Sequence, residues 1–186
     1  MRRSADWICH IADISVVNAP GTKYIYKEWD VILLAKLLDQ ACGDMFDFID
    51  DNLYKPLSIK SKRWYKSNCQ VTYSVAKGDE GSDESCSNLT AHELLKIGQL
   101  FLKDGVFNER RILSKDYIKE AVSPSRRNPG YGYLWWIGDG WYGCRGFGGQ
   151  NITVVPEKKA VFVMQATPTS RGRSYDDVAW FCLDYL

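Results

Sequence analysis

The chain has 186 residues, of which 45% are hydrophobic and 13% aromatic, so it is long and apolar enough to bury a core. Its 24 basic and 23 acidic side chains leave a formal net charge of +1, which argues against nucleic acid or an anionic membrane as a partner. No apolar run reaches the roughly 20 residues that span a bilayer, and the N-terminus lacks the apolar region of a signal peptide. We expect one domain without a membrane span.

The cysteines give no sign of a metal site. Six of them are spread along the chain without a C-x-x-C pair and without histidines grouped around them. Scattered single thiols are typical of reduced packing residues, and a metal site would need clustered His, Cys or carboxylate ligands. We therefore expect no metal and no cofactor, and the thiols favour a reducing compartment such as the cytoplasm.

The N-terminal part predicts a helix, a turn and a short extended segment. Residues 1–18 contain an amphipathic stretch that favours a short helix. A turn follows at residues 19–22, because proline fixes φ and glycine adopts conformations that other residues avoid. Residues 23–26 are then extended, with Tyr24 and Tyr26 on the same face.

Two helices and a long loop come next. Apolar residues keep helical spacing over residues 31–41, which predicts a core helix that ends at Gly43. Asp44 can cap the second helix, which Pro56 stops. Residues 61–88 are polar and rich in Ser, Lys, Asp and Gly, so we expect a long surface loop that can serve as a lid.

Two further helices have clear start signals. Thr90 and Glu93 predict a capping box, and Gly105 ends the helix that it begins. Ser114 can cap another helix that runs to about Val122.

Residues 131–165 predict a meander of three antiparallel strands, YGYLWWI, CRGFGGQNITVV and AVFVMQA, joined by short turns. The middle strand opens with Gly146, Gly148 and Gly149, which a strand tolerates for a bulge or for the close approach of a ligand to its backbone. Both interpretations stay open on these residues alone. A last helix is expected over residues 175–186, so the fold class is α+β.

Motifs for nucleophilic catalysis are sparse. There is no Gly-x-Ser-x-Gly elbow for a Ser-His-Asp triad. Serine chemistry without histidine uses S-x-x-K, and one copy occurs at Ser74-Val75-Ala76-Lys77. It lies in the polar loop with Gly78 directly after it, rather than at the start of a core helix, so we interpret it as a chance match.

An ordered set of motifs resembles the β-lactamase-related serine hydrolases, which include class C β-lactamases, penicillin-binding proteins, esterases and 6-aminohexanoate-oligomer hydrolases. The motifs in chain order are PGTKYIY at 20–26, LYKPLSI at 53–59, LTAHELLKIGQL at 89–100, ILS at 112–114, YGYLWW at 131–136 and GFGGQ at 146–150. The resemblance implies the C-terminal part of a β-lactamase/transpeptidase-like α+β fold. Its helical lobe would cover about residues 1–125, and its antiparallel meander with the C-terminal helix about 130–186.

The resemblance also implies a general base and a neighbouring substrate contact. Tyr26 matches the tyrosine of the family's Tyr-x-Asn motif, where a phenol beside a lysine shuttles the serine proton. Glu28 stands where the family has Asn, and would belong to the substrate wall.

The family's third motif, Lys-Thr-Gly or His-x-Gly on an edge strand, matches Phe147, Gly148 and Gly149. These residues would complete the substrate wall, and the Gln150 N–H is where the second oxyanion donor would be. Because this match has lost the motif's cation, the pattern is closer to the esterase or amide-hydrolase branches than to a true β-lactamase.

The family's first motif, the nucleophilic S-x-x-K, lies upstream of the Pro-Gly-Thr turn, where this chain has no match. The resemblance therefore implies a portion of a serine hydrolase that acts by acyl transfer on a small-molecule ester or amide and is inactive by itself. The alternative is a non-catalytic binding or scaffold protein of the same fold. Either way, we expect exposed apolar surface near the meander and Tyr26, or a homo-oligomer that covers it.

Overall fold

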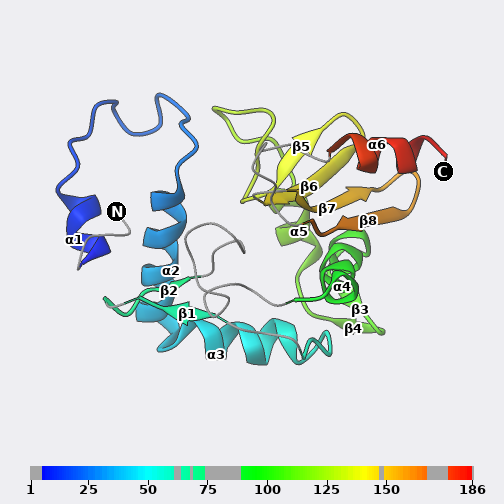
Figure 1. Ribbon diagram of the computed structural model, residues 1–186, viewed down its shortest axis with the longest axis horizontal. Helices are drawn as coiled ribbons and strands as arrows, with labels where there is room; N and C mark the ends of the chain where they lie inside the picture. The colour runs from blue at the N-terminus through cyan, green and yellow to red at the C-terminus, as the bar shows by residue number, and fades with distance from the viewer. Residues whose placement is uncertain are drawn as a thin grey trace.

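The computed structural model describes residues 6–60, 64–67, 69–73, 89–146, 149–166 and 176–185. These residues form a helical lobe and a sheet lobe that lie side by side in Figure 1. The helical lobe contains α1 (Trp7–Ala12), α2 (Glu28–Cys42), α3 (Met45–Ile49), the π-helical turn η1 (Asp50–Tyr54), β1 (Tyr65–Lys66) and β2 (Thr72–Tyr73). The sheet lobe contains α4 (Ala91–Leu102), β3 (Val106–Phe107), β4 (Arg110–Arg111), α5 (Lys115–Ala121), β5 (Trp136–Gly138), β6 (Trp141–Gly146), β7 (Gln150–Val155), β8 (Ala160–Met164) and α6 (Asp176–Asp184).

The helix α2 is less buried than its sequence predicts. It ends at Gly43 as expected, but Ala35 is its one buried residue, while Val31, Leu34 and Leu37 are exposed. The predicted core helix thus contributes to a core on one side only, where Ala35 belongs to an apolar cluster against which Ile32 and Leu38 pack. Among the described residues α2 packs against α3 and β2, which cover only part of a helix whose apolar residues extend over a wider face.

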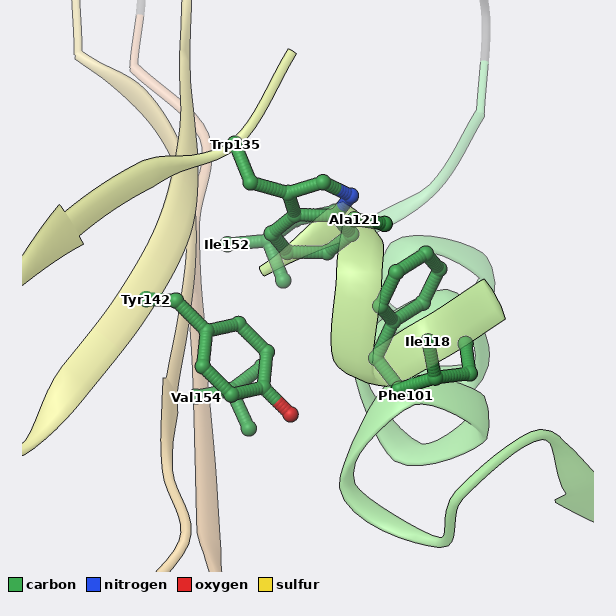
Figure 2. Packing of buried hydrophobic residues seen from close by; sticks show 7 residues of the cluster. All are labelled: Phe101, Ile118, Ala121, Trp135, Tyr142, Ile152 and Val154. Atoms are coloured by element: carbon green, nitrogen blue, oxygen red, sulfur yellow. The ribbon is translucent and has the colours of Figure 1, made fainter. Parts of the chain in front are cut away.

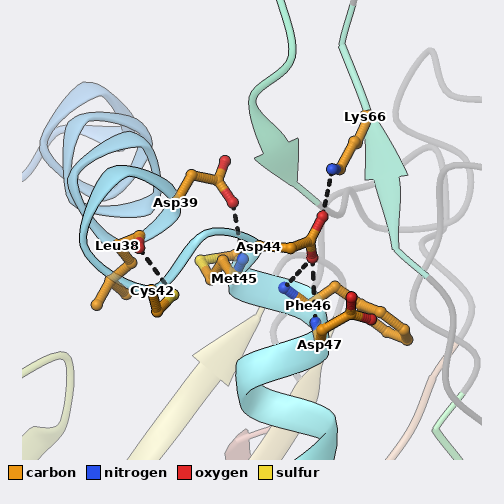
Figure 3. Close-up of polar contacts among 8 residues, drawn as sticks. All are labelled: Leu38, Asp39, Cys42, Asp44, Met45, Phe46, Asp47 and Lys66. Atoms are coloured by element: carbon orange, nitrogen blue, oxygen red, sulfur yellow. Dashed lines mark hydrogen bonds and ion pairs between the residues drawn. The ribbon is translucent and has the colours of Figure 1, made fainter.

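Two carboxylates shape the junction between α2 and α3 (Figure 3). Asp39, near the end of α2, accepts a hydrogen bond from the Met45 N–H at 2.8 Å. Asp44 caps α3 by accepting from two N–H groups of its first turn at 2.8 and 3.1 Å, which confirms the predicted cap. Lys66 of β1 pairs with the other Asp44 oxygen, so the cap also fixes the β1–β2 hairpin.

The capping box at the start of α4 is confirmed and does more than begin a helix. Thr90 and Glu93 exchange the expected hydrogen bonds, and the second carboxylate oxygen of Glu93 accepts from the Lys60 N–H at 2.7 Å. The capping box thus fixes the end of the helical lobe to the start of the sheet lobe. A shared apolar cluster, in which Leu57 and Leu100 are fully buried, supports the same junction.

The sheet has four strands rather than the three that the sequence predicts. Strands β5 to β8 are antiparallel and adjacent in chain order. The predicted middle strand is two strands, because Gly146 pairs with Gln150 across a hairpin and Gly149, at φ +94°, provides the left-handed residue that such a turn needs. Gly146 and Gly149 therefore close a hairpin between β6 and β7 rather than form a bulge in one continuous strand, and the close approach of a ligand to this backbone stays a prediction.

Helices cover one face of this sheet (Figure 2). Phe101 of α4 and Ile118 of α5 pack against Trp135 and against β6 and β7, where Tyr142 and Val154 are buried. The close approach of α4 depends on Gly98, since a Cβ there would lie 2.4 Å from Val161 Cγ1 of β8.

The opposite face carries α6, whose Trp180 ring contacts Trp141 of β6 at 5.2 Å between centroids. Phe181 and Tyr185 of this helix are exposed, so the apolar side of the predicted C-terminal helix is not buried by the described residues. Exposed apolar side chains also lie at Tyr26 and Leu134, which confirms the exposed surface predicted near the Tyr26 segment and the meander.

Some predicted features lie outside the described residues. These are the S-x-x-K match at residues 74–77, most of the polar loop, and the motif residues Phe147 and Gly148. In the described part of the chain, no helix is both long enough and apolar enough to cross a bilayer.

Candidate active site

Tyr26 lies in the segment that joins α1 to α2. The predicted turn is present at its start, where the N–H and the hydroxyl of Thr22 both donate to the Ala19 carbonyl, at 3.2 and 2.6 Å. Beyond this turn the segment runs without helix or strand until α2 begins. Tyr26 therefore needs tertiary contacts to hold its position.

Those contacts come from residues a hundred positions later in the chain. Arg127 donates from Nε to the Gly21 carbonyl at 2.5 Å. The Asn128 side chain hydrogen-bonds the Tyr24 phenol, although burial outweighs this bond and raises the pKa of Tyr24. The Tyr26 segment is thus attached to the loop that leads into β5.

An aromatic cluster completes the attachment. The Tyr26 ring lies 5.9 Å from the Tyr131 ring and 5.5 Å from the Trp136 ring, and these two are 4.9 Å apart. Tyr131 and Trp136 are largely buried, whereas Tyr26 keeps 56% of its surface exposed. One side of the Tyr26 ring therefore rests on the sheet lobe while much of the ring remains open to a ligand.

The Tyr26 phenol has two other phenols near it, those of Tyr24 and Tyr131. Burial, together with the neighbouring phenols of Tyr26 and Tyr24, raises the pKa of Tyr131 to about 12. Among the described residues, no hydrogen bond or ion pair joins a lysine to Tyr26, and Lys27 instead lies over the Trp29 ring at 5.4 Å. A cation that could stabilise a tyrosinate must therefore come from elsewhere.

Glu28, the second predicted residue on this side, is the first residue of α2 and is exposed. A carboxylate in the first turn of a helix is stabilised by the helix dipole, which accounts for its presence without a ligand. Its position two residues after Tyr26 leaves it on the surface beside the tyrosine.

Gln150 and Gly149 lie at the other end of the sheet. Gly149 is buried and donates to the Gly146 carbonyl at 3.4 Å, closing the hairpin between β6 and β7. Gln150 begins β7, and its side-chain amide donates to the Ala166 carbonyl. β5 pairs with β6 only from Trp141 to Gly143, so the end of β6 that leads into this motif pairs with β7 alone among the described residues.

The described structure does not bring Tyr26 and Gln150 into contact. Trp136, which touches Tyr26, pairs with Gly143, whereas Gln150 pairs with Gly146, three residues farther along β6. Strand geometry then separates Trp136 from Gln150 by about 10 Å along the strands and about 10 Å across them. Chemistry that uses both residues requires a reacting group between them.

Phe147, which matches the cation position of the family's third motif, lies outside the described residues. Arg145 of β6 is the cation two positions before it, and its guanidinium lies 4.7 Å from the centre of the Trp141 ring. The expectation that this motif is poorly suited to a β-lactam carboxylate rests on the sequence and stays a prediction.

Several residues that build the site were not predicted as site residues from the sequence. Arg127 and Asn128, together with Tyr131 and Trp136 of the YGYLWW motif, hold the Tyr26 segment. The alternation of Tyr24 and Tyr26 was the available signal, because two rings on one face of an extended segment need an aromatic or apolar partner.

Comparisons with known proteins agree with this architecture. The β-lactamase family model matches residues 3–183. An uncharacterized protein of Alkalihalophilus pseudofirmus is 22% identical over an alignment of 174 positions that covers 77% of this chain and 52% of that protein.

Two solved structures share the fold. A candidate β-lactamase from Bacteroides dorei has a TM-score of 0.65 at 13% identity, and the match covers 90% of this chain and 58% of that one. A candidate 6-aminohexanoate-dimer hydrolase from Bacillus anthracis has a TM-score of 0.60 at 20% identity, over 91% of this chain and 47% of that one. The chain thus spans about half the length of these relatives. With a family model that matches nearly every residue and a shared α+β fold, the chain belongs to the β-lactamase family.

Proposed function

We propose that this chain forms part of a serine hydrolase that transfers an acyl group from an ester or amide, and that a segment outside these residues supplies the S-x-x-K nucleophile. The observation that carries the proposal is the position of Tyr26. The tyrosine that matches the family's general base is held against β5 by Tyr131 and Trp136, with 56% of its surface exposed. Such a phenol can receive the proton of an attacking serine if a lysine lies beside it.

The other predicted residues take supporting roles in this proposal. The Gln150 N–H would donate to the oxyanion, and Glu28 with Phe147, Gly148 and Gly149 would contact the substrate. The separation between Tyr26 and Gln150 supports this division of roles, because the attacking serine and the carbonyl carbon would lie between base and oxyanion donor.

The experiment begins with the genomic DNA upstream of Met1. If an in-frame S-x-x-K segment lies there, the longer protein is expressed and assayed with p-nitrophenyl esters and a fluorophosphonate label. Tyr26→Phe should lower kcat by about 10²-fold or more, whereas Tyr117→Phe, on the exposed surface of α5, should leave it unchanged. Hydrolysis that survives Tyr26→Phe would remove the tyrosine from the mechanism.

A non-catalytic binding or scaffold protein remains the alternative, and one observation favours it. Among the described residues no lysine contacts Tyr26, so the usual means of activating the phenol is not in place. A stop codon directly upstream of Met1, together with no labelling by fluorophosphonate or fluorescent penicillin, would support this alternative. Labelling of Ser74 would instead show that the S-x-x-K match in the polar loop is functional.

We also propose that the exposed apolar surface is covered in the working protein, and a homo-oligomer is one way to do so. Ile25, Tyr26, Tyr133 and Leu134 are all exposed and lie at the Tyr26 segment and the approach to β5. Light scattering after size exclusion tests this, since a second copy would give twice the mass of the chain.

A further inference from the structure

The helix α2 has an apolar face that the described residues leave largely uncovered. Val31, Leu34, Leu37 and Ala41 form this face, which we call the open face of α2. Their spacing of three, three and four residues places them along one side of the helix. Val31, Leu34 and Leu37 are 43%, 44% and 61% exposed. The open face extends over about 15 Å, which is long enough for a second helix to pack along it.

The contacts that α2 makes lie on another side of the helix. Ala35 is buried in a cluster with Trp7 of α1 and Met45 of α3, and Ile32 packs against the same cluster. In Figure 1, α1 accordingly lies beside α2 and α3 follows at its end. Because consecutive residues of an α-helix point about 100° apart, Ala35 and the neighbouring Leu34 face different ways. These partners therefore leave the open face to another element.

The open face begins at the end of α2 that follows Tyr26. Tyr26 lies two residues before the helix, and Val31 lies at the end of the first turn. The Tyr26 ring is 56% exposed, and among the described residues no hydrogen bond or ion pair joins a lysine to it. One end of α2 therefore combines an uncovered phenol with the start of an uncovered apolar face, and apolar residues over so wide an arc are typical of a helix that packs on more than one side.

We infer that the open face is the docking surface for an apolar helix that carries the S-x-x-K nucleophile in its first turn. The inference rests on the proposed function, in which a segment outside these residues supplies that motif. The relatives have the length for such a segment, because the matches cover 52%, 58% and 47% of their chains. The occupant is thus a segment of the same longer protein rather than a second copy.

One helix would cover the open face and also supply the lysine. Residues three apart lie on the same side of a helix, so the serine and the lysine of S-x-x-K point the same way. When this helix runs parallel to α2, its first turn lies next to Tyr26 and its following apolar turns pack on Leu34, Leu37 and Ala41. Helix axes that pack in this way are about 8–10 Å apart, a distance that a lysine side chain can bridge. The lysine would then lie beside the Tyr26 phenol, and the exposed leucines would be buried.

The test compares two proteins that differ only in the upstream segment. One is the 186-residue chain, and the other is the longer protein encoded together with the sequence upstream of Met1. Leu34→Gln combined with Leu37→Gln keeps the helix propensity, since glutamine and leucine are similar helix formers. This double variant should lower the midpoint of thermal unfolding by about 5 °C or more in the longer protein, where the face is buried, and by about 2 °C or less in the 186-residue chain.

A matched control and a direct map of the contact complete the design. Val16→Gln combined with Val17→Gln removes two side chains that are 81% and 79% exposed, and it should change both proteins by the same small amount. Benzoylphenylalanine in place of Val31 should cross-link, in the longer protein, to residues within about one turn of the S-x-x-K serine. In place of Ala41 it should cross-link to residues about ten positions farther on, because the two helices run parallel.

Hydrolysis of p-nitrophenyl esters is measured separately in the unchanged longer protein. If it hydrolyses esters while the open-face variant behaves alike in both proteins and the cross-links miss the S-x-x-K helix, the inference is overturned and the proposed function stands. If variant and cross-links behave as expected without hydrolysis, the inference stands and the proposed function falls. A stop codon directly before Met1 also overturns the inference. So does a 186-residue chain of twice its own mass that the open-face variant returns to a single mass, because a second copy would then cover this face.

Discussion

Arg127 donates a hydrogen bond from Nε to the carbonyl oxygen of Gly21 at 2.5 Å, across 106 positions of the sequence. This bond attaches the segment that carries Tyr26 to the loop before β5. A charged donor on a backbone carbonyl contributes about 1 kcal/mol at an exposed site. Arg127→Ala should therefore lower the free energy of unfolding by about 1 kcal/mol and speed amide exchange at residues 22–26.

Arg126→Ala is the matched control for that measurement. Arg126 is exposed and adjacent in sequence, and its side chain makes no hydrogen bond or ion pair with the described residues. Its removal should leave both the unfolding curve in urea and the exchange rates unchanged. Equal effects of the two variants would mean that the bond to Gly21 does not hold the segment.

Leu134 adopts φ +63° while 46% of its surface is exposed, a conformation that costs a residue with a Cβ about 1–2 kcal/mol. Leu134→Gly removes that strain. Glycine also loses more conformational freedom on folding, which costs about 0.5–1 kcal/mol. The variant should thus be more stable by up to about 1 kcal/mol in urea unfolding. Leu134→Ala keeps the Cβ and the strain, so it should show no gain; a gain of equal size would place the effect in the lost side chain.

Two opposing effects determine the stability of a Gly98→Ala variant. Alanine is the better helix former by about 1 kcal/mol, but a Cβ here would lie 2.4 Å from Val161 Cγ1 and 3.0 Å from Ile152 Cγ2. Overpacking of this kind costs about 1–3 kcal/mol. We therefore expect Gly98→Ala to lower the midpoint of thermal unfolding, and Gly98→Ala combined with Val161→Ala to recover part of the loss.

The ion pair of Lys66 with Asp44 predicts a pH dependence. The hydrogen bond from Lys66 lowers the pKa of Asp44 below 3.8, and the same bond raises the pKa of Lys66 above 10.5. The stability from the lowered carboxyl pKa is present above pH 3.8 and is lost as the pH falls below it. The stability from the raised amine pKa is present below pH 10.5 and is lost as the pH rises above it.

Lys66→Met should accordingly lower the free energy of unfolding at neutral pH by no more than about 1 kcal/mol, because both partners are partly exposed. The difference from the unchanged chain should shrink toward both acid and alkaline pH. Lys119→Met, at an exposed position on α5, should show no such pH-dependent difference. A constant difference across the pH range would mean that Lys66 acts through packing alone.

Sequence signals that span only a few residues were sufficient to predict where several helices begin. Asp44, Thr90 and Ser114 were predicted as caps, and each accepts the expected hydrogen bonds, because capping depends on a side chain and the next three N–H groups. The ordered motifs were likewise enough to indicate the family, which the match over residues 3–183 confirms.

The tertiary structure decided what these local signals leave open. The sequence of α2 shows which residues are apolar but not how many neighbours cover them, and its exposed leucines follow from packing on one side only. Likewise, the glycines before Gln150 fit a bulge or a ligand contact within one strand, and only the pairing of Gly146 with Gln150 shows that Gly146 and Gly149 close a hairpin. The contacts that hold the Tyr26 segment could not be predicted for the same reason. Arg127 and Trp136 are about a hundred residues away in sequence, and only folding brings them to the tyrosine.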